Sequence, residues 1–106
     1  MKQHRYRITV EHLHDAQGAP STHVPLAFEV GNHDDILAIV ERIRARELFD
    51  GNTATAFAVG LKLFGEVMLE NRGHPLFSEF APAFREFMKK LKSQGPAPSP
   101  NAGQGG

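Results

Sequence analysis

The stretch AFAVGLKLFGEVML, residues 56–69, constrains this chain more than any other, because it holds ten hydrophobic residues, two glycines and only two charges. A membrane span needs about 20 apolar residues, and this run is shorter and carries Lys62 and Glu66. On an α-helix, Thr55, Lys62, Glu66 and Glu70 form one narrow polar strip, and the rest of the circumference is mostly apolar. We therefore expect a largely buried central helix in a small domain.

Two segments near the N-terminus alternate between apolar and polar residues, which is the pattern of half-buried strands. They cover residues 5–11 and 26–30, and the turn-rich residues 13–23 lie between them. This arrangement predicts an antiparallel β-hairpin. A lone two-stranded hairpin is marginally stable in water, so it must pack on helices or pair with strands of another copy. The second possibility is a first argument for a dimer.

A helix is predicted between the hairpin and the central helix. Asn32 is a suitable N-cap, and Asp34 and Asp35 in the first turn suit the positive end of the helix dipole. The apolar residues Ile36, Ile39, Val40 and Ile43 then follow helical spacing, and we expect the helix to end near Arg46.

The central helix is expected to start at a cap formed by Asn52 or Thr53 and to end before Gly73 and Pro75. Gly60 and Gly65 lie inside it, and each costs about 1 kcal/mol relative to alanine in a helix interior. We interpret both glycines as sites where a neighbouring element, from this chain or another, approaches the backbone closely.

Residues 74–92, HPLFSEFAPAFREFMKKLK, predict an amphipathic helix with a phenylalanine stripe. Pro82 removes a helical hydrogen bond, so we expect a short helical turn before it or a kink. Most of the eight phenylalanines are expected in the core, with an oligomer interface as the alternative.

The element order is therefore β-β-α-α-α, an α+β fold in a single domain over residues 1–92. Residues 93–106 contain four glycines, three prolines and no charge, which predicts a disordered tail.

Composition excludes several functions. The 12 Lys and Arg balance the 12 Asp and Glu, so no overall field attracts nucleic acid or an anionic membrane. With no cysteine, disulfides, thiolate metal sites and a cysteine nucleophile are excluded. The N-terminal MKQHRYRITV has no apolar run like that of a signal peptide, so we expect a cytoplasmic protein.

The segments RYRITVEHL, VGNHDDILAIVERIRA, LFDGNTATAFAVGLKLFGEVMLENR and PLFSEFAPAFREFMKKLK together resemble a family of small bacterial proteins, domain of unknown function 3861. The resemblance covers nearly all of residues 4–92. It implies a bacterial α+β protein of about this length, and it brings no activity, cofactor or catalytic residue.

The six histidines are the first candidates for chemistry. His12 and His14 would share one face if the first strand extended to them, and His23 and His33 could lie near the same end, which would suit a metal site. No carboxylate stands at a recognised zinc spacing, and the motif H-E-x-x-H is absent. We favour solvated or core-edge histidines in a turn-rich region over metal ligands, with His12 and His14 as the metal candidates.

The acidic and basic clusters also have plain explanations. Asp34 and Asp35, beside His33, could act as an acid/base pair or hold magnesium, but their place at a helix N-terminus favours capping. Solvated faces are favoured over a nucleic-acid site for the basic residues, because glutamates are interspersed among them. These basic residues are Arg5, Arg7, Arg42, Arg46, Lys89, Lys90 and Lys92.

The sequence favours a small non-enzymatic cytoplasmic module that self-associates as a homodimer, through its hairpin edge or an apolar helix face, and binds another protein. It assigns no catalytic residue and no cofactor. The alternative is an enzyme or a metal- or ligand-binding domain that uses His12, His14, His33 and Asp34. Nucleic-acid binding is a third and weaker hypothesis.

Overall fold

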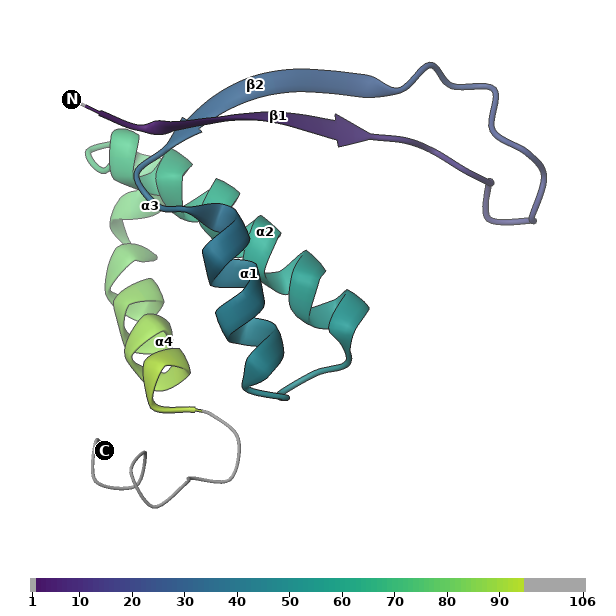
Figure 1. The fold of residues 1–106 in the computed structure, drawn as a ribbon. Coiled ribbons are helices and arrows are strands. Elements are labelled where there is room, and N and C mark those ends of the chain that lie inside the picture. The colour runs from purple at the N-terminus through teal and green to yellow at the C-terminus, as the bar shows by residue number, and fades with distance from the viewer. Residues whose placement is uncertain (1, 95–106) are drawn as a thin grey trace. The chain divides into compact units, whose positions relative to one another are not determined.

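A computed structural model of the chain describes residues 2–94 (Figure 1). The chain divides between His33 and Asp34 into two compact units, an N-terminal hairpin and a helical unit. The predicted disordered tail, residues 93–106, lies outside the described residues except for Ser93 and Gln94, which are the last residue and the C-cap of the final helix. The β-hairpin followed by helices confirms the predicted α+β class.

The hairpin consists of strands β1 (His4–Val10) and β2 (Leu26–Asn32), which pair antiparallel from His4 opposite Asn32 to Val10 opposite Leu26. In the connecting loop, one carboxylate oxygen of Asp15 accepts hydrogen bonds from the backbone N–H groups of Gln17 and Ala19, both at 2.9 Å. An aspartate that bonds the backbone two residues ahead stabilises a tight turn. The hydrogen bonds of Asp15 therefore explain why the turn-rich segment between the strands forms a tight turn.

Helix α1 (Ile36–Ala45) begins later than predicted. Its N-cap is Asp35, whose carboxylate accepts from the Ala38 N–H at 3.1 Å. The prediction of Asn32 as the cap is wrong, because Asn32 is still the last residue of β2 and pairs with His4. The helix ends at the C-cap Arg46, as predicted, and the next residue, Glu47, adopts a left-handed φ of 57°.

Helix α2 (Gly51–Glu70) is the predicted central helix. The prediction of Asn52 or Thr53 as its N-cap is wrong: Asp50 is the cap, and its carboxylate accepts from the Thr53 N–H at 2.8 Å. Four residues of α2 are buried, whereas others are exposed, so its burial within one chain is partial. The buried residues are Ala54, Ala58, Glu66 and Met68, and the exposed apolar ones include Phe64, Val67 and Leu69.

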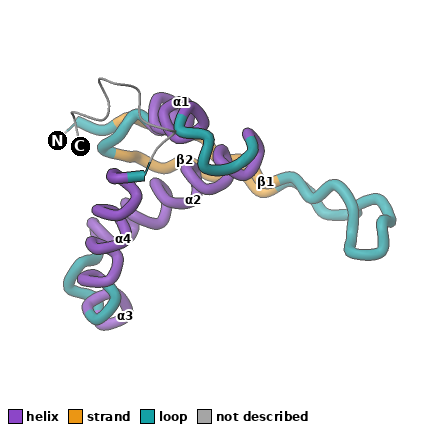
Figure 2. The backbone as a smooth tube through the Cα atoms, turned by 90° about the horizontal axis from the view of Figure 1, so that it is seen from below, coloured by secondary structure: helices purple, strands orange, loops and turns teal. Residues whose placement is uncertain are grey.

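The last segment forms two helices, α3 (Pro75–Ser78) and α4 (Ala81–Ser93), with the break visible in Figure 2. Pro82 lies in the first turn of α4, where its missing N–H removes no helical hydrogen bond. The prediction of a short helical turn before Pro82 is confirmed. The imidazole Nδ1 of His74 caps α3 by accepting from the Leu76 N–H at 3.0 Å.

The core of the helical unit lies where α1, α2 and α4 meet. Its buried members are Ile43 of α1, Ala54 and Ala58 of α2, and Leu91 of α4. Ala54 and Ala58 are 1% and 0% exposed. Small side chains at a helix crossing let the two backbones approach closely, so these alanines set the spacing between α1 and α2, which run side by side in Figure 1.

None of the helices in the described part of the chain is long and apolar enough to cross a membrane.

We predict that Ala58→Leu destabilises the protein by about 1–3 kcal/mol, because a filled interior accommodates extra methylene groups only by straining its neighbours. The matched control is Ala56→Leu, which adds the same atoms to an exposed position of the same helix. Urea unfolding of the two variants measures the difference. Equal free energies of unfolding would show that α1 and α2 are not held at this spacing.

We also predict a pH-dependent effect of the α2 cap. Hydrogen bonds from the Thr53 N–H and hydroxyl to the carboxylate hold the pKa of Asp50 below its ordinary value of 3.8. Because the folded state binds this proton less readily than the unfolded state, the stabilisation is fully present above pH 3.8 and is lost as the pH falls through the lower folded pKa.

Asp50→Ala should therefore lower the melting temperature at neutral pH, and the difference from the unmodified protein should shrink as the pH falls below 3.8. Thermal unfolding followed by circular dichroism at several pH values measures both effects. Asn52→Ala removes the side chain that the sequence predicts as the cap and should leave the melting temperature unchanged. A larger effect of Asn52→Ala would contradict the assignment.

Candidate functional site

The candidate metal residues His12 and His14 lie beyond the end of β1, in the exposed loop of the hairpin. His12 contacts His23 rather than His14, with the ring centroids 5.0 Å apart, and its Nδ1 shares a 2.7 Å hydrogen bond with Ser21 Oγ. His14 forms an isolated β-bridge with Pro20. Within residues 2–94, no group of three or more histidine or carboxylate side chains could hold a metal ion.

The neighbouring acids of the His33-Asp34-Asp35 run have separate roles. Asp35 caps α1, as the favoured capping interpretation implies. Asp34 forms an ion pair with Lys62 of α2, with Oδ2 and Nζ 2.6 Å apart. The two carboxylates are therefore engaged with different partners.

The basic residues of the hairpin are paired with an acid. Arg5 and Arg7 both contact the carboxylate of Glu29, at 3.7 and 2.9 Å, on exposed surface. On α4, Lys89 pairs with Glu86 at 3.5 Å. Exposed pairs of this kind contribute little to stability, and they reduce the positive charge that these residues offer to a nucleic acid.

The phenylalanines of the helical unit form a connected surface, which we call the phenylalanine face. Their ring centroids are linked by edge-on or stacked contacts of 5.4–6.5 Å, from Phe49 at one end to Phe77 at the other. Such contacts are favourable aromatic geometries. The face comprises Phe49, Phe57, Phe64, Phe77, Phe80, Phe84 and Phe87.

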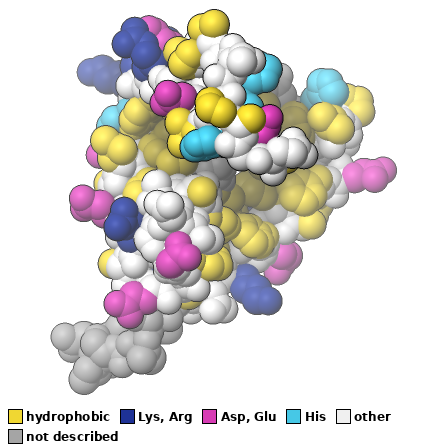
Figure 3. Space-filling view, turned by 90° about the vertical axis from the view of Figure 1, so that its right-hand side faces the viewer, with side chains coloured by type: hydrophobic (Ala, Val, Ile, Leu, Met, Phe, Trp, Pro, Cys, Tyr) yellow, Lys and Arg dark blue, Asp and Glu magenta, His cyan; other side chains and the backbone are white. Residues whose placement is uncertain are grey.

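None of the eight phenylalanines is buried, so the expectation that they fill the core is wrong. Phe49, Phe64, Phe80 and Phe87 are each 43–45% exposed. The physical reason is that the centre of the helical unit is occupied by smaller side chains, and among the phenylalanines only Phe57 is found packed against this cluster in the described residues. Hydrophobic side chains are visible at the surface in the space-filling view (Figure 3, yellow).

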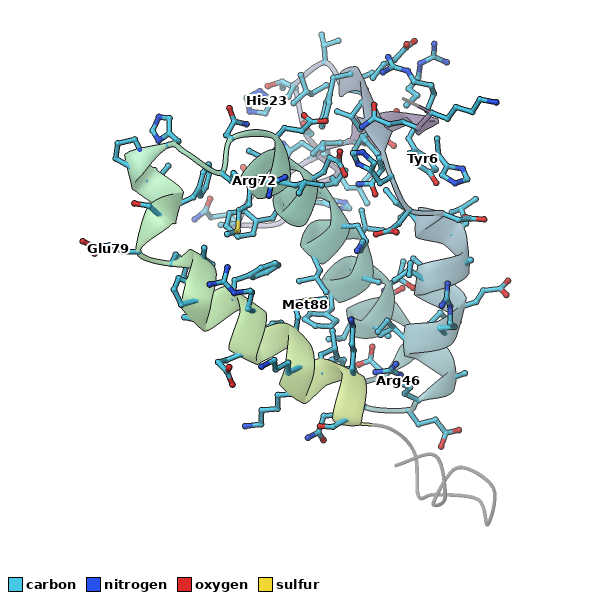
Figure 4. The ribbon with its side chains drawn as sticks, turned by 90° about the vertical axis from the view of Figure 1, so that its left-hand side faces the viewer. Tyr6, His23, Arg46, Arg72, Glu79 and Met88 are labelled. Carbon is cyan, nitrogen blue, oxygen red and sulfur yellow. The ribbon has the colours of Figure 1, made fainter. Side chains whose placement is uncertain are left out.

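A second feature of the helical unit is a cavity of about 300 Å³ between α1, α2 and α4, which we call the basic groove. Basic side chains from all three helices line it, together with one acid and an apolar floor. The charged residues are Asp34, Arg42, Arg46, Lys62 and Lys92, and the apolar residues are Ile39, Ile43, Leu61, Met88 and Leu91. Figure 4 shows Arg46 beside the last turn of α4 and Met88 on the side of α4 that faces α2.

The comparisons with known proteins identify the family. Residues 4–93 match the model of the Domain of Unknown Function with solved structure, DUF3861. The chain belongs to this family. The resemblance found in the sequence is thereby confirmed, and this membership assigns no activity to the chain.

A crystal structure of a protein of unknown function from Pectobacterium atrosepticum SCRI1043 is similar to this chain, with 42% sequence identity and a TM-score of 0.76. The similarity covers 88% of this chain and 100% of that chain. No match to a curated protein was found.

Sequence reasoning found the parts of the basic groove but not the groove itself. The helical pair Arg42 and Arg46 was recognisable from its four-residue spacing, and Lys92 from the basic end of α4. Lys62 carried no such signal, because it was assigned to the polar strip of α2. Only the crossing of the three helices brings these residues to one cavity.

The two glycines of α2 differ from expectation. A Cβ at Gly60 would meet nothing within 4 Å, and one at Gly65 would lie 3.7 Å from Phe84 Cζ, which is an ordinary contact. The predicted close backbone approach is therefore absent within the described chain.

We predict that Gly60→Ala stabilises the isolated chain by about 1 kcal/mol, because alanine favours the helix and the added methyl meets open space. Chemical unfolding at low protein concentration measures the gain. If Gly60→Ala destabilised the protein only at higher protein concentration, another copy of the chain would approach the backbone at Gly60. Destabilisation at every concentration would contradict the open space seen here.

Proposed function

We propose that this DUF3861 protein is a small bacterial, cytoplasmic, non-enzymatic module that self-associates as a homodimer and uses the phenylalanine face as its dimer interface. The observation that carries the proposal is that four phenylalanine rings, linked directly or through Phe57 and Phe84, remain 43–45% exposed. The bacterial source of the solved relative supports the bacterial assignment.

The size of the exposed aromatic surface supports an interface. At roughly 200 Å² per aromatic side chain, the exposed fractions of these four rings correspond to roughly 350 Å² of apolar surface. The largest apolar patch of a typical soluble monomer is about 300–600 Å² and is often functional, so a patch of this size is a candidate interaction site. The half-buried rings beside them enlarge the surface that a partner can cover.

A second copy of the chain is the partner that these features favour. In a two-fold symmetric dimer the same patch meets itself, so a self-complementary apolar face needs no matching charges. The formal net charge of zero means that two copies do not repel each other electrostatically. The open space at Gly60, on the same helix as Phe64, leaves room for close contact with another backbone.

The hairpin offers a rival interface. Its sheet has two strands among the described residues, and its apolar side chains Val24 and Leu26 are 87% and 61% exposed. Unpaired strand edges also promote association. We favour the phenylalanine face because its apolar side chains are contiguous, as the ring contacts demonstrate.

The alternative of an enzyme or metal-binding domain has less support. It needs histidine and carboxylate groups that converge on one point, whereas His12 contacts His23 and Ser21. Asp34 is engaged with Lys62.

We predict that the protein sediments at twice its chain mass of 11.7 kDa at micromolar concentration. Phe87→Asp and Phe80→Asp, which place a charge on the face, should each weaken the dimer by about tenfold or more. Analytical ultracentrifugation over a concentration series gives the dissociation constants, and circular dichroism verifies that the variants remain folded.

Two matched controls locate the interface. Leu37→Asp adds the same charge to α1 at a position 69% exposed and outside the phenylalanine face, and it should leave the dimer intact. Val24→Asp does the same in the hairpin. Dissociation by Val24→Asp but not by Phe87→Asp would assign the interface to the hairpin, and a monomeric unmodified protein would reject self-association altogether.

A further inference from the structure

We infer that the basic groove is a binding site for a small organic anion with a carboxylate head and a short apolar body. The head would be held by Arg42, Arg46 and Lys92, and the body would lie on the floor formed by Ile43 and Met88. This site is separate from the phenylalanine face and does not depend on self-association.

The lining of the groove carries a net positive charge, whereas the whole chain is formally neutral. Four basic residues and one acid line the cavity, whereas the chain carries 12 of each sign. Lys62 is paired with Asp34. In the described part of the chain, the side chains of Arg42 and Lys92 form neither a hydrogen bond nor an ion pair. Within the described residues, no acid is paired with the Arg42 and Lys92 side chains at this rim.

The spacing of the two arginines places like charges close together. Arg42 and Arg46 are four residues apart at the end of α1, where like charges repel by a few tenths of a kcal/mol. Lys92 of α4 adds a third charge to the same cavity. A bound anion would replace this repulsion by attraction, which gives the cluster a physical role.

Arg46 is already held in place. Its Nη1 donates a 2.6 Å hydrogen bond to the Leu91 carbonyl oxygen at the end of α4, and its side chain is half-buried. A guanidinium has five N–H donors in a rigid plane, so one bond to the backbone leaves others for a ligand. Arginine binds carboxylates through two parallel hydrogen bonds, and a fixed guanidinium loses less entropy in doing so.

The apolar floor of the groove indicates the size and character of the ligand's body. Ile43 and Leu91 are 4% and 9% exposed, and Met88 is half-buried beside them. The cavity of about 300 Å³ is at the lower end of small-molecule sites, and it holds the volume of roughly ten water molecules. A short aliphatic or aromatic body fits this volume, and the flexible thioether of Met88 adapts to its shape.

The ion pair of Asp34 with Lys62 orients the ligand. The carboxylate of Asp34 is 48% exposed and lies on the groove, so it disfavours a second anion at its side. The head is thereby directed toward Arg42, Arg46 and Lys92. A monoanion with one polar end suits this asymmetry better than inorganic phosphate, which has no apolar part to place on the floor.

The test uses three probes on the full chain: octanoate, octanol and inorganic phosphate. We expect octanoate to bind with saturable amide shifts in two-dimensional NMR, centred on the end of α1 and the last turns of α4. Octanol, without the charge, and phosphate, without the apolar body, should each bind at least tenfold more weakly. The affinity for octanoate should fall as salt is raised, because the rim is exposed to solvent.

Two variants and a matched control identify the residues. Arg42→Gln and Lys92→Gln should each weaken octanoate binding by about threefold, and together by about tenfold. Lys90→Gln removes the same charge from α4 at a position outside the groove and should have no effect. These side chains are exposed, so the variants should fold normally.

Each outcome decides the inference. Equal binding of octanol and octanoate would reject the role of the basic rim, and equal binding of phosphate would reject the apolar floor. Shifts centred on the phenylalanine face, or an equal loss of affinity in Lys90→Gln, would place the ligand elsewhere. Octanoate that binds to no saturable site would overturn the inference entirely.

Discussion

The close packing of α1 against α2 at two buried alanines is the constraint on which the rest of the helical unit depends. Ala54 and Ala58 are almost fully excluded from solvent and contact Ile43, which is also buried. Because the space between the two helices is filled by small side chains, no room remains there for aromatic rings. The phenylalanine rings instead meet one another between α2 and the segment that forms α3 and α4.

This displacement explains why a chain with many aromatic residues exposes so many of them. The rings from Phe49 to Phe77 contact one another edge-on and leave about half of several rings uncovered. The contacts between neighbouring rings make the phenylalanine face continuous. A contiguous apolar surface on a chain with no net charge is the physical basis of the proposed self-association.

The same crossing of helices has a different consequence at the C-terminal end of α1. The last turn of α4 comes close enough for Arg46 to reach the Leu91 carbonyl, which fixes one guanidinium at the rim of the basic groove. Apolar side chains continue beneath it from the core. The groove thus combines a positive rim with an apolar floor, because the core and the ends of two helices meet at one place.

The sequence by itself determined the α+β class, the hairpin, the central helix, the break at Pro82 and the family, because these follow from periodicity, turn residues and sequence similarity. The caps were assigned to wrong residues, Asn32 and Asn52 or Thr53 in place of Asp35 and Asp50. The reason is that several polar residues precede each helix, and the paired length of β2 and the path of the loop choose among them.

Only the tertiary structure decided which apolar residues are buried. Helical periodicity places residues on a face, but it does not tell whether that face meets a neighbouring helix or solvent. The partial exposure of the phenylalanines and the gathering of Arg42, Arg46, Lys62 and Lys92 at one cavity both depend on how α1, α2 and α4 cross. That crossing is set by side-chain volumes at residues far apart in the chain, which no local pattern in the sequence records.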